Sequence, residues 1–181
     1  SACTEASVSY SGTGTLTITF GSTAYIHNVS VEYLTVTDED IAATAPYDAE
    51  VSTAAELLYA LGKASGAARY KILLRNGVYN LGTAYNTQVR NKTSLIGESR
   101  DGVIIQNHPT TEGIWSSATL KTGSNVIIQN LTLHSIVAYN SSTKAERGTA
   151  LYDEGSGNVY KNIRLLGRQD TYYSDNNASS Y

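Results

Sequence analysis

The sequence is poor in several kinds of residue, and each shortage excludes a class of structure or site. Its 181 residues include one cysteine, no methionine, two prolines, one tryptophan and one phenylalanine. A single cysteine cannot form an internal disulfide, so stability must come from packing. The three histidines, His27, His108 and His134, lie far apart, and no cluster of cysteine and histidine has metal-ligand spacing. We therefore predict no metal and no cofactor.

Charged residues are also scarce, at 16% of the chain, and the net charge is −3. Nucleic-acid binding depends on neutralising phosphates, and the chain has no basic stripe that would do so. No apolar run reaches the ~20 residues of a membrane-spanning helix, and the first residues lack the charged start and apolar core of a signal peptide. The sequence therefore predicts neither a nucleic-acid partner nor a membrane span.

What the chain has instead is 15 glycines, 14 tyrosines and 41% hydrophobic residues. This composition favours a globular domain rich in β structure. Residues 15–20 and 24–34 alternate with the period of strands, so residues 1–37 are predicted to form a β-hairpin extension or the remnant of an accessory module. Acidic residues and a proline then interrupt the pattern, and residues 38–50 are predicted to be a linker.

The main domain is predicted to cover residues 51–181 and to begin with one helix. Thr53 and Glu56 have the spacing of a capping box, and three leucines follow at helical spacing. From Lys71 onward, short apolar runs are bounded by glycine and asparagine. We expect all of these later elements to be strands.

These apolar runs contain an internal repeat. The pentapeptide Val-Ile-Ile-Gln-Asn starts at Val103 and again at Val126, 23 residues later, and the pattern of residues 130–133 returns at 162–165, after 32 residues. Repeats of this length are typical of stacked coils, so an all-β, parallel β-helix is predicted. The extra residues around 135–145 are expected to form a projecting loop. A β-sandwich with coincidental similarity is the alternative.

Asparagine recurs at the edges of the repeats, at Asn107, Asn130 and Asn162. These side chains are either polar ligands or turn residues. Asparagine tolerates the left-handed backbone conformation of a turn, and stacked asparagines can hydrogen-bond to one another. We therefore expect a ladder of turn asparagines rather than a binding site.

Polar side chains follow apolar strand patterns between residues 147 and 173. Arg147 precedes one strand pattern, and Gln169 and Asp170 lie at the end of the next. Because these positions mark the ends of successive strand segments, we predict that the three side chains meet at one surface. Asp170 is the candidate catalytic acid. Catalysis by paired carboxylates needs a second one, and the sequence offers no convincing partner.

Five segments between residues 51 and 181 follow the order of a known set of motifs. They are Gly77-Val78-Tyr79 for GxYxE, Leu95-Ile96-Gly97-Glu98-Ser99-Arg100-Asp101 for LIGEGRD, Ser117-Ala118-Thr119-Leu120, Arg147-Gly148-Thr149-Ala150-Leu151 in place of QAVAL, and Gly167-Arg168-Gln169-Asp170-Thr171 for GxQDT. Each segment alone is weak, whereas five in order are specific. Together they resemble the pectin methylesterase (pectinesterase) family.

The resemblance implies a right-handed parallel β-helix that hydrolyses the methyl esters of polygalacturonate and releases methanol. In the family, the Asp of the QDT motif is the general acid and base, and a second Asp, in a later DFIFG segment, attacks the ester carbonyl. Asp170 and Gln169 match the Asp and Gln of QDT and are the predicted catalytic residues. An amide donor such as that of Gln169 contributes roughly 3 kcal/mol when it is aimed at the developing oxyanion.

Three further residues are predicted to bind the polysaccharide. Arg147 stands in place of the QAVAL glutamine and either binds an oxyanion or a galacturonate carboxylate, or weakens Asp170 as an acid by stabilising its charged form. Thr119 is expected at the cleft from its place in the motif. Of Tyr172 and Tyr173, one is expected to face the cleft, and Tyr172 is chosen.

The DFIFG segment does not occur before Tyr181, so the resemblance predicts an N-terminal portion of the family's chain that ends before the second catalytic Asp. Such a portion is expected to be inactive unless the missing residues come from elsewhere. An incomplete stack would expose unpaired strands, so self-association through the open end is a predicted contact. The predicted location is secreted, cell-surface or periplasmic.

Two other functions remain open. The first is a non-catalytic or degenerate β-helix that binds pectin or another acidic polysaccharide, with Arg147 as a carboxylate clamp. The second is a pectate lyase, which would need a calcium-binding cluster of carboxylates. Asp153-Glu154 is the adjacent acidic pair near the predicted cleft. The lyase is ranked last.

Overall fold

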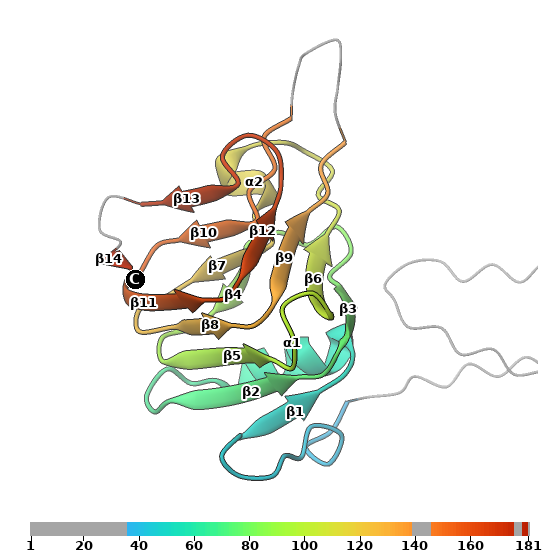
Figure 1. Ribbon diagram of the computed structural model, residues 1–181, viewed down its shortest axis with the longest axis vertical. Coiled ribbons are helices and arrows are strands. Elements are labelled where there is room, and N and C mark those ends of the chain that lie inside the picture. Colours follow the sequence, from blue (N-terminus) through green and yellow to red (C-terminus); the bar gives the residue numbers. More distant parts are fainter. Residues whose placement is uncertain (1–35, 139–145, 176–178, 181) are drawn as a thin grey trace, which may run out of the picture. The chain divides into compact units, whose positions relative to one another are not determined.

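The computed structural model describes residues 36–138, 146–175 and 179–180. In these residues the chain winds through three sheets, each built from parallel strands (Figure 1). The first sheet has the order β1 (Ala49–Val51), β2 (Tyr70–Leu74), β5 (Thr93–Gly97), β8 (Ile127–Gln129), β11 (Ser156–Lys161), β14 (Ser179–Ser180). The second has β3 (Gly77–Asn80), β6 (Val103–Asn107), β9 (Thr132–Ser135), β12 (Arg164–Leu166). The third has β4 (Thr87–Val89), β7 (Leu120–Thr122), β10 (Leu151–Asp153), β13 (Tyr172–Ser174).

The chain visits the three sheets in turn, so that each coil adds one parallel strand to every sheet. Strand β5 pairs with β2, β6 with β3 and β7 with β4, and the later coils repeat this pattern (Figure 1). A β-sandwich has no such order. The predicted all-β, parallel β-helix is therefore confirmed, whereas the predicted N-terminal hairpin lies outside the described residues.

The predicted helix forms as α1 (Ala54–Lys63) and contacts β1 and β3. Its capping box is complete, because Thr53 Oγ1 accepts from the Glu56 amide at 3.2 Å and Glu56 Oε2 accepts from the Thr53 amide at 3.2 Å. Leu57 and Leu61 are buried against the first coil. No helix in the described part of the chain is long and apolar enough to cross a membrane.

Two expectations about the local structure change. The expectation that every later element is a strand is wrong, because α2 (Ile114–Ser117) forms one helical turn before β7. The Ser117 hydroxyl donates to the Gly113 carbonyl at 2.6 Å and holds this turn. The segment predicted as a linker also joins the core, since Ile41 is buried and Ala49 pairs with Ile72 in the first sheet.

Apolar side chains stack inside the coils. Ile72, Leu95 and Ile128 are aligned on consecutive strands of the first sheet, and all three are fully buried. Burying such a side chain stabilises the fold by about 1.5–3 kcal/mol. Aligned inner positions of this kind build the core from one coil to the next.

The two copies of the repeated pentapeptide do not stack on each other. The copy at 103–107 is β6 of the second sheet, whereas the copy at 126–130 contains β8 of the first sheet. The spacing of 32 residues is the structural one, because Leu133 aligns with Leu165 and Ile127 with Val159.

The turn asparagines are predicted correctly at two of three positions. Asn130 and Asn162 have φ angles of 56° and 51°, and Asn162 Nδ2 donates to Asn130 Oδ1 at 3.0 Å. Asn107 instead ends β6 and is fully buried. Its Nδ2 donates to the carbonyls of Ala84 and Ser117. Asn107 therefore ties the core to the loop at Ala84 and to the end of the helical turn at Ser117, and does not belong to the ladder.

Candidate functional site

The outer surface of the third sheet gathers polar and aromatic side chains. Gln88, Lys121, Tyr152 and Tyr173 occupy aligned positions on β4, β7, β10 and β13. Leu120 and Leu151, which precede Lys121 and Tyr152 in their strands, are aligned with each other and fully buried. Because successive side chains of a strand point to opposite faces, the four aligned polar and aromatic side chains lie on the outer face. We call this surface the outer face of the third sheet.

Three aromatic rings meet on this face. Trp115, from α2, lies edge-on to Tyr173 with 5.9 Å between ring centroids, and Tyr152 lies edge-on to Tyr173 at 5.4 Å. Trp115 is 60% exposed, whereas Tyr152 is nearly buried beneath its neighbours. Burial, followed by the hydrogen bond from the Tyr152 hydroxyl to Asp175, raises the pKa of Tyr152. Trp115, Tyr152 and Tyr173 form an aromatic platform with exposed apolar surface.

Arg147 is held beside this platform by Glu112. Its Nε donates to Oε2 at 2.7 Å and its Nη2 to Oε1 at 2.9 Å, which is the bidentate geometry of a strong ion pair. The pair holds the pKa of Glu112 below its usual range and raises the pKa of Arg147. The nearby Asp170 carboxylate raises the pKa of Arg147 further. The segments of Arg147 and Asp170 lie side by side, because the Arg168 amide donates to the Gly148 carbonyl, and Glu112 occupies much of the predicted carboxylate clamp.

Asp170 sits at a turn that is fixed by the coil beneath it. Its φ of 62° is left-handed, a conformation that Asp adopts more readily than most residues. The turn is pinned because the Arg168 amide donates to the Gly148 carbonyl at 3.2 Å. A Cβ at Gly167 would lie 2.1 Å from that same carbonyl, so only glycine fits. Gln169 and Asp170 are both exposed on this turn.

The structure places the other two predicted binding residues away from this face. Thr119 is fully buried, and its hydroxyl donates to Asn107 Oδ1 at 2.8 Å. Tyr172 continues the inner row of Leu151, and its hydroxyl donates to Asp153 Oδ2 at 2.9 Å. Tyr172 is nevertheless 43% exposed, whereas the partly exposed Tyr173 is the one aligned with Tyr152 on the outer face. The one-residue alternation of β13 decides this difference.

The adjacent acids of the lyase alternative point to opposite sides of the third sheet. Asp153 faces inward, is fully buried and accepts from Asn158 Nδ2 at 2.7 Å. Glu154 is exposed and forms an ion pair with Lys121 at 3.0 Å. Among the described residues, no three His, Cys, Asp or Glu side chains form a group that could hold a metal.

Sequence reasoning missed Glu112 and the aromatic platform. Glu112 precedes α2, 35 residues before Arg147, and belongs to no motif. The sole tryptophan, Trp115, lies two residues before the Ser117-Ala118-Thr119-Leu120 segment. Its position is the signal that the sequence offers, since a lone tryptophan next to a motif is a candidate for ligand contact.

Solved structures with a similar fold are pectin methylesterases. One is pectin methylesterase PemA from Erwinia chrysanthemi, with 25% identity and a TM-score of 0.58; the match covers 72% of this chain and 46% of that one. A second, in complex with hexasaccharide VII, has 28% identity and a TM-score of 0.52, and covers 64% of this chain and 40% of that one. A third, a pectin methylesterase mutant in complex with hexasaccharide IV, has 26% identity and a TM-score of 0.55; the match covers 65% of this chain and 40% of that one.

The resemblance read from the motifs is thus confirmed at the level of fold. The chain spans less than half the length of the pectin methylesterase structures that it matches. No protein-family model and no curated protein matches the sequence.

Proposed function

We propose, from its likeness to pectin methylesterases in motifs and in fold, that the chain carries the general acid and base of an enzyme that hydrolyses the methyl esters of pectin. One observation supports this most: the segments of Asp170 and Arg147 lie side by side, and Glu112, the partner of Arg147, is three residues before Trp115 of the aromatic platform. Two of the similar structures hold hexasaccharides. Pectin is the proposed substrate and methanol the product.

The proposed reaction assigns Asp170 two proton transfers. A carboxylate attacks the ester carbonyl and forms an acyl intermediate, while protonated Asp170 gives its proton to the departing methoxyl oxygen and methanol leaves. The Asp170 carboxylate then takes a proton from water, whose oxygen attacks the acyl carbon and releases the free galacturonate. Gln169 is the proposed oxyanion donor, a role worth roughly 3 kcal/mol. The resemblance assigns the attacking carboxylate to a DFIFG segment that these 181 residues do not contain.

The platform is the proposed seat of the sugar rings. Trp115 exposes its indole, and Tyr173 supports that ring from the edge. Flat apolar faces of pyranose rings pack well on such aromatic surfaces, and rigid aromatics lose little entropy on binding. Because pectin lies outside the cell, the proposed location is secreted, cell-surface or periplasmic.

A non-catalytic polysaccharide-binding role is the second candidate. Glu112 already neutralises Arg147 through two hydrogen bonds, which weakens the case for Arg147 as a catalytic cation. In this alternative the platform binds the polymer, and Asp170 has no chemical role.

Methanol release from highly methylated pectin separates the two candidates. The assay uses the complete gene product, its Asp170→Asn variant, and Glu39→Gln, which removes an exposed carboxylate that is remote in sequence from Asp170. Loss of the general acid and base is expected to lower kcat about 100-fold or more while pectin binding persists. Equal release by the wild type and Asp170→Asn would contradict the catalytic assignment. Binding without any methanol release would favour the second candidate.

A further inference from the structure

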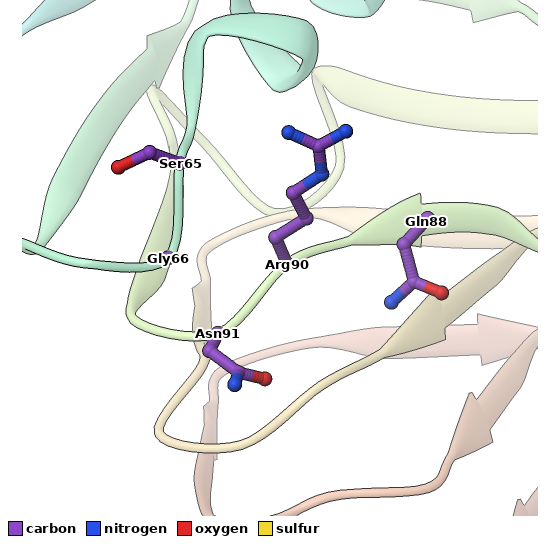
Figure 2. A pocket seen from close by; sticks show the side chains of 5 residues that line it. All are labelled: Ser65, Gly66, Gln88, Arg90 and Asn91. Carbon is purple, nitrogen blue, oxygen red and sulfur yellow. The ribbon is translucent and has the colours of Figure 1, made fainter.

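An open pocket of about 260 Å³ lies at the other end of the third sheet, beside β4. Its lining residues are Ser65, Gly66, Gln88, Arg90 and Asn91. Figure 2 shows Gln88 and Arg90 extending from the same chain segment, with Ser65 and Gly66 on the loop that passes next to them. The proposed esterase chemistry at Asp170 does not use this pocket.

Three basic side chains surround the loop that forms the pocket wall. Arg90 Nη1 donates to the Ala64 carbonyl at 3.2 Å, and Lys92 Nζ donates to the Ala67 carbonyl at 2.9 Å. Arg69, at the end of the loop, donates to the Asn125 carbonyl at 3.0 Å. We call Arg69, Arg90 and Lys92 the basic corner.

Most other cations in the described part of the chain are ion-paired, and Lys71 and Lys161 are the exceptions. Lys63, Arg75, Arg100, Lys121, Arg147, Arg164 and Arg168 each form an ion pair with a carboxylate. Within the described ranges, none of the three basic-corner residues does, although all three are exposed. Backbone carbonyls already fix their positions, so less side-chain entropy is lost on binding. Unpaired, prepositioned cations in an acidic protein form a local site for anions.

The pocket reaches the outer face of the third sheet through one lining residue, Gln88. Gln88 is aligned with Lys121 and, through it, with Tyr152. From β4 to β13 there are three strand steps, or roughly 14 Å at the usual spacing. At the β4 end, Arg90 forms no ion pair among the described residues, whereas near Asp170 the cations Arg147 and Arg168 are paired with Glu112 and Glu146. A free carboxylate therefore suits the β4 end.

We propose that this pocket, with Arg90 as its main donor, binds the free carboxylate of a de-esterified galacturonate unit. Guanidinium groups recognise carboxylates through short, charge-assisted hydrogen bonds. Gln88 and Asn91 supply amide groups for the sugar hydroxyls. The identity of the polymer rests on the proposed function; the anion site itself rests on the basic corner. A partly de-esterified chain is then held at β4 while a methylated unit lies nearer Asp170.

Titration with unesterified trigalacturonate tests the site. Binding is measured by calorimetry, and the contacted residues are identified from backbone amide NMR shifts, for the wild type, Arg90→Gln, Arg90→Lys and Lys161→Gln. Lys161 is an exposed lysine in β11 of the first sheet and serves as the matched control. Arg90→Gln is expected to weaken binding roughly five-fold, as suits an exposed ion pair. Arg90→Lys should restore part of the loss, and Lys161→Gln should bind like the wild type.

The location of the shifts decides the result. Shifts at Ser65, Gly66 and Asn91 that vanish in Arg90→Gln support the proposal. Unchanged affinity in Arg90→Gln, absence of binding, or shifts confined to Tyr152 and Tyr173 would overturn it.

Fully methylated trigalacturonate keeps this test separate from the proposed function. If it shifts Tyr152 and Tyr173 while the unesterified form leaves the pocket untouched, the pocket proposal alone fails. If the unesterified form binds the pocket and the methylated form binds nowhere, the pocket stands and the esterase proposal loses its substrate contact.

Discussion

The interior of the β-helix changes character from one end of the third sheet to the other. Val89, Thr122 and Asp153 are aligned on consecutive strands, β4, β7 and β10, and all three are fully buried. One inner row therefore passes from an apolar residue to a hydroxyl and then to a carboxylate. The early coils are held together by apolar packing, whereas the later coils also depend on directional hydrogen bonds.

The polar part of this row is a connected network. Asp153 Oδ1 accepts from Asn158 at 2.7 Å and from Thr122 at 3.2 Å, and its Oδ2 accepts from Tyr172 at 2.9 Å. Thr122 Oγ1 also lies 3.1 Å from the Tyr160 hydroxyl, whose pKa is raised by burial. A satisfied network of this kind fixes one arrangement, while a broken one leaves costly unpaired groups. The two ends should therefore respond differently to substitution.

Leu95→Ala is expected to cause the largest change, because it removes an inner side chain from the apolar end. Leu95 is fully buried between Ile72 and Ile128 in the first sheet. The cavity should lower the free energy of unfolding by about 3 kcal/mol, measured by urea denaturation. Ile96→Ala, at the next and partly exposed position, should cost clearly less. Equal losses would show that inner packing does not dominate this end.

Asp153→Ala tests the polar end of the comparison. It removes the acceptor of the hydrogen bonds from Asn158 at 2.7 Å and from Tyr172 at 2.9 Å, which should cost about 2 kcal/mol in unfolding free energy. Asp153→Asn keeps one carbonyl acceptor and should recover part of the loss. Denaturation of Val89→Ala, in the same row, gives the apolar reference. A fully stable Asp153→Ala protein would remove the distinction between the two ends.

The coil architecture could be predicted from sequence because its signals are local. Apolar runs bounded by glycine and asparagine indicate short strands, and the Thr53–Glu56 capping box marks the helix with its correct start. Which sheet a run joins depends on the lengths of the preceding loops. The identical runs at 103–107 and 126–130 therefore belong to different sheets despite their shared letters.

The candidate site was less accessible to sequence reasoning, because side-chain direction and distant pairing decide it. A shift of one position separates Tyr172, in an inner row, from Tyr173, on the outer face. Thr119 follows its motif but lies beneath the surface, bound to Asn107. The partner of Arg147 is Glu112, and no local pattern links the two.

The asparagine ladder offers a smaller test at the corner of the later coils. Asn162→Ala removes the hydrogen bond to Asn130 and places a Cβ-bearing, non-polar residue at a φ of 51°. The expected loss of unfolding free energy is about 1–2 kcal/mol. Asn162→Gly also removes the hydrogen bond but accepts the backbone angle, so it should be the milder change. If thermal unfolding ranked the two variants in the opposite order, backbone conformation would not be the reason for asparagine here.

The smallest expected effect concerns His134, a partly exposed side chain of β9. Its substitution distinguishes a loss of stability at acid pH that arises at the surface from one that arises in the polar interior. Burial, and then the nearby His108 and Arg164, lower the pKa of His134. The folded state therefore favours the neutral ring. Stability from this group is fully present above the unfolded pKa of about 6.5 and declines as pH falls from there towards the lower folded pKa.

The His134→Gln variant should lose this part of the pH dependence. Between neutral pH and pH values below the unfolded pKa of about 6.5, the free energy of unfolding should fall for the wild type. This fall should exceed that of the variant by a fraction of a kcal/mol, on the order of the effect of one modest pKa shift. His108→Gln removes one of the two neighbouring charges and should reduce the difference without abolishing it. Parallel pH profiles for the wild type and His134→Gln would assign any acid sensitivity to groups other than this histidine, and the polar interior would then be the next region to test.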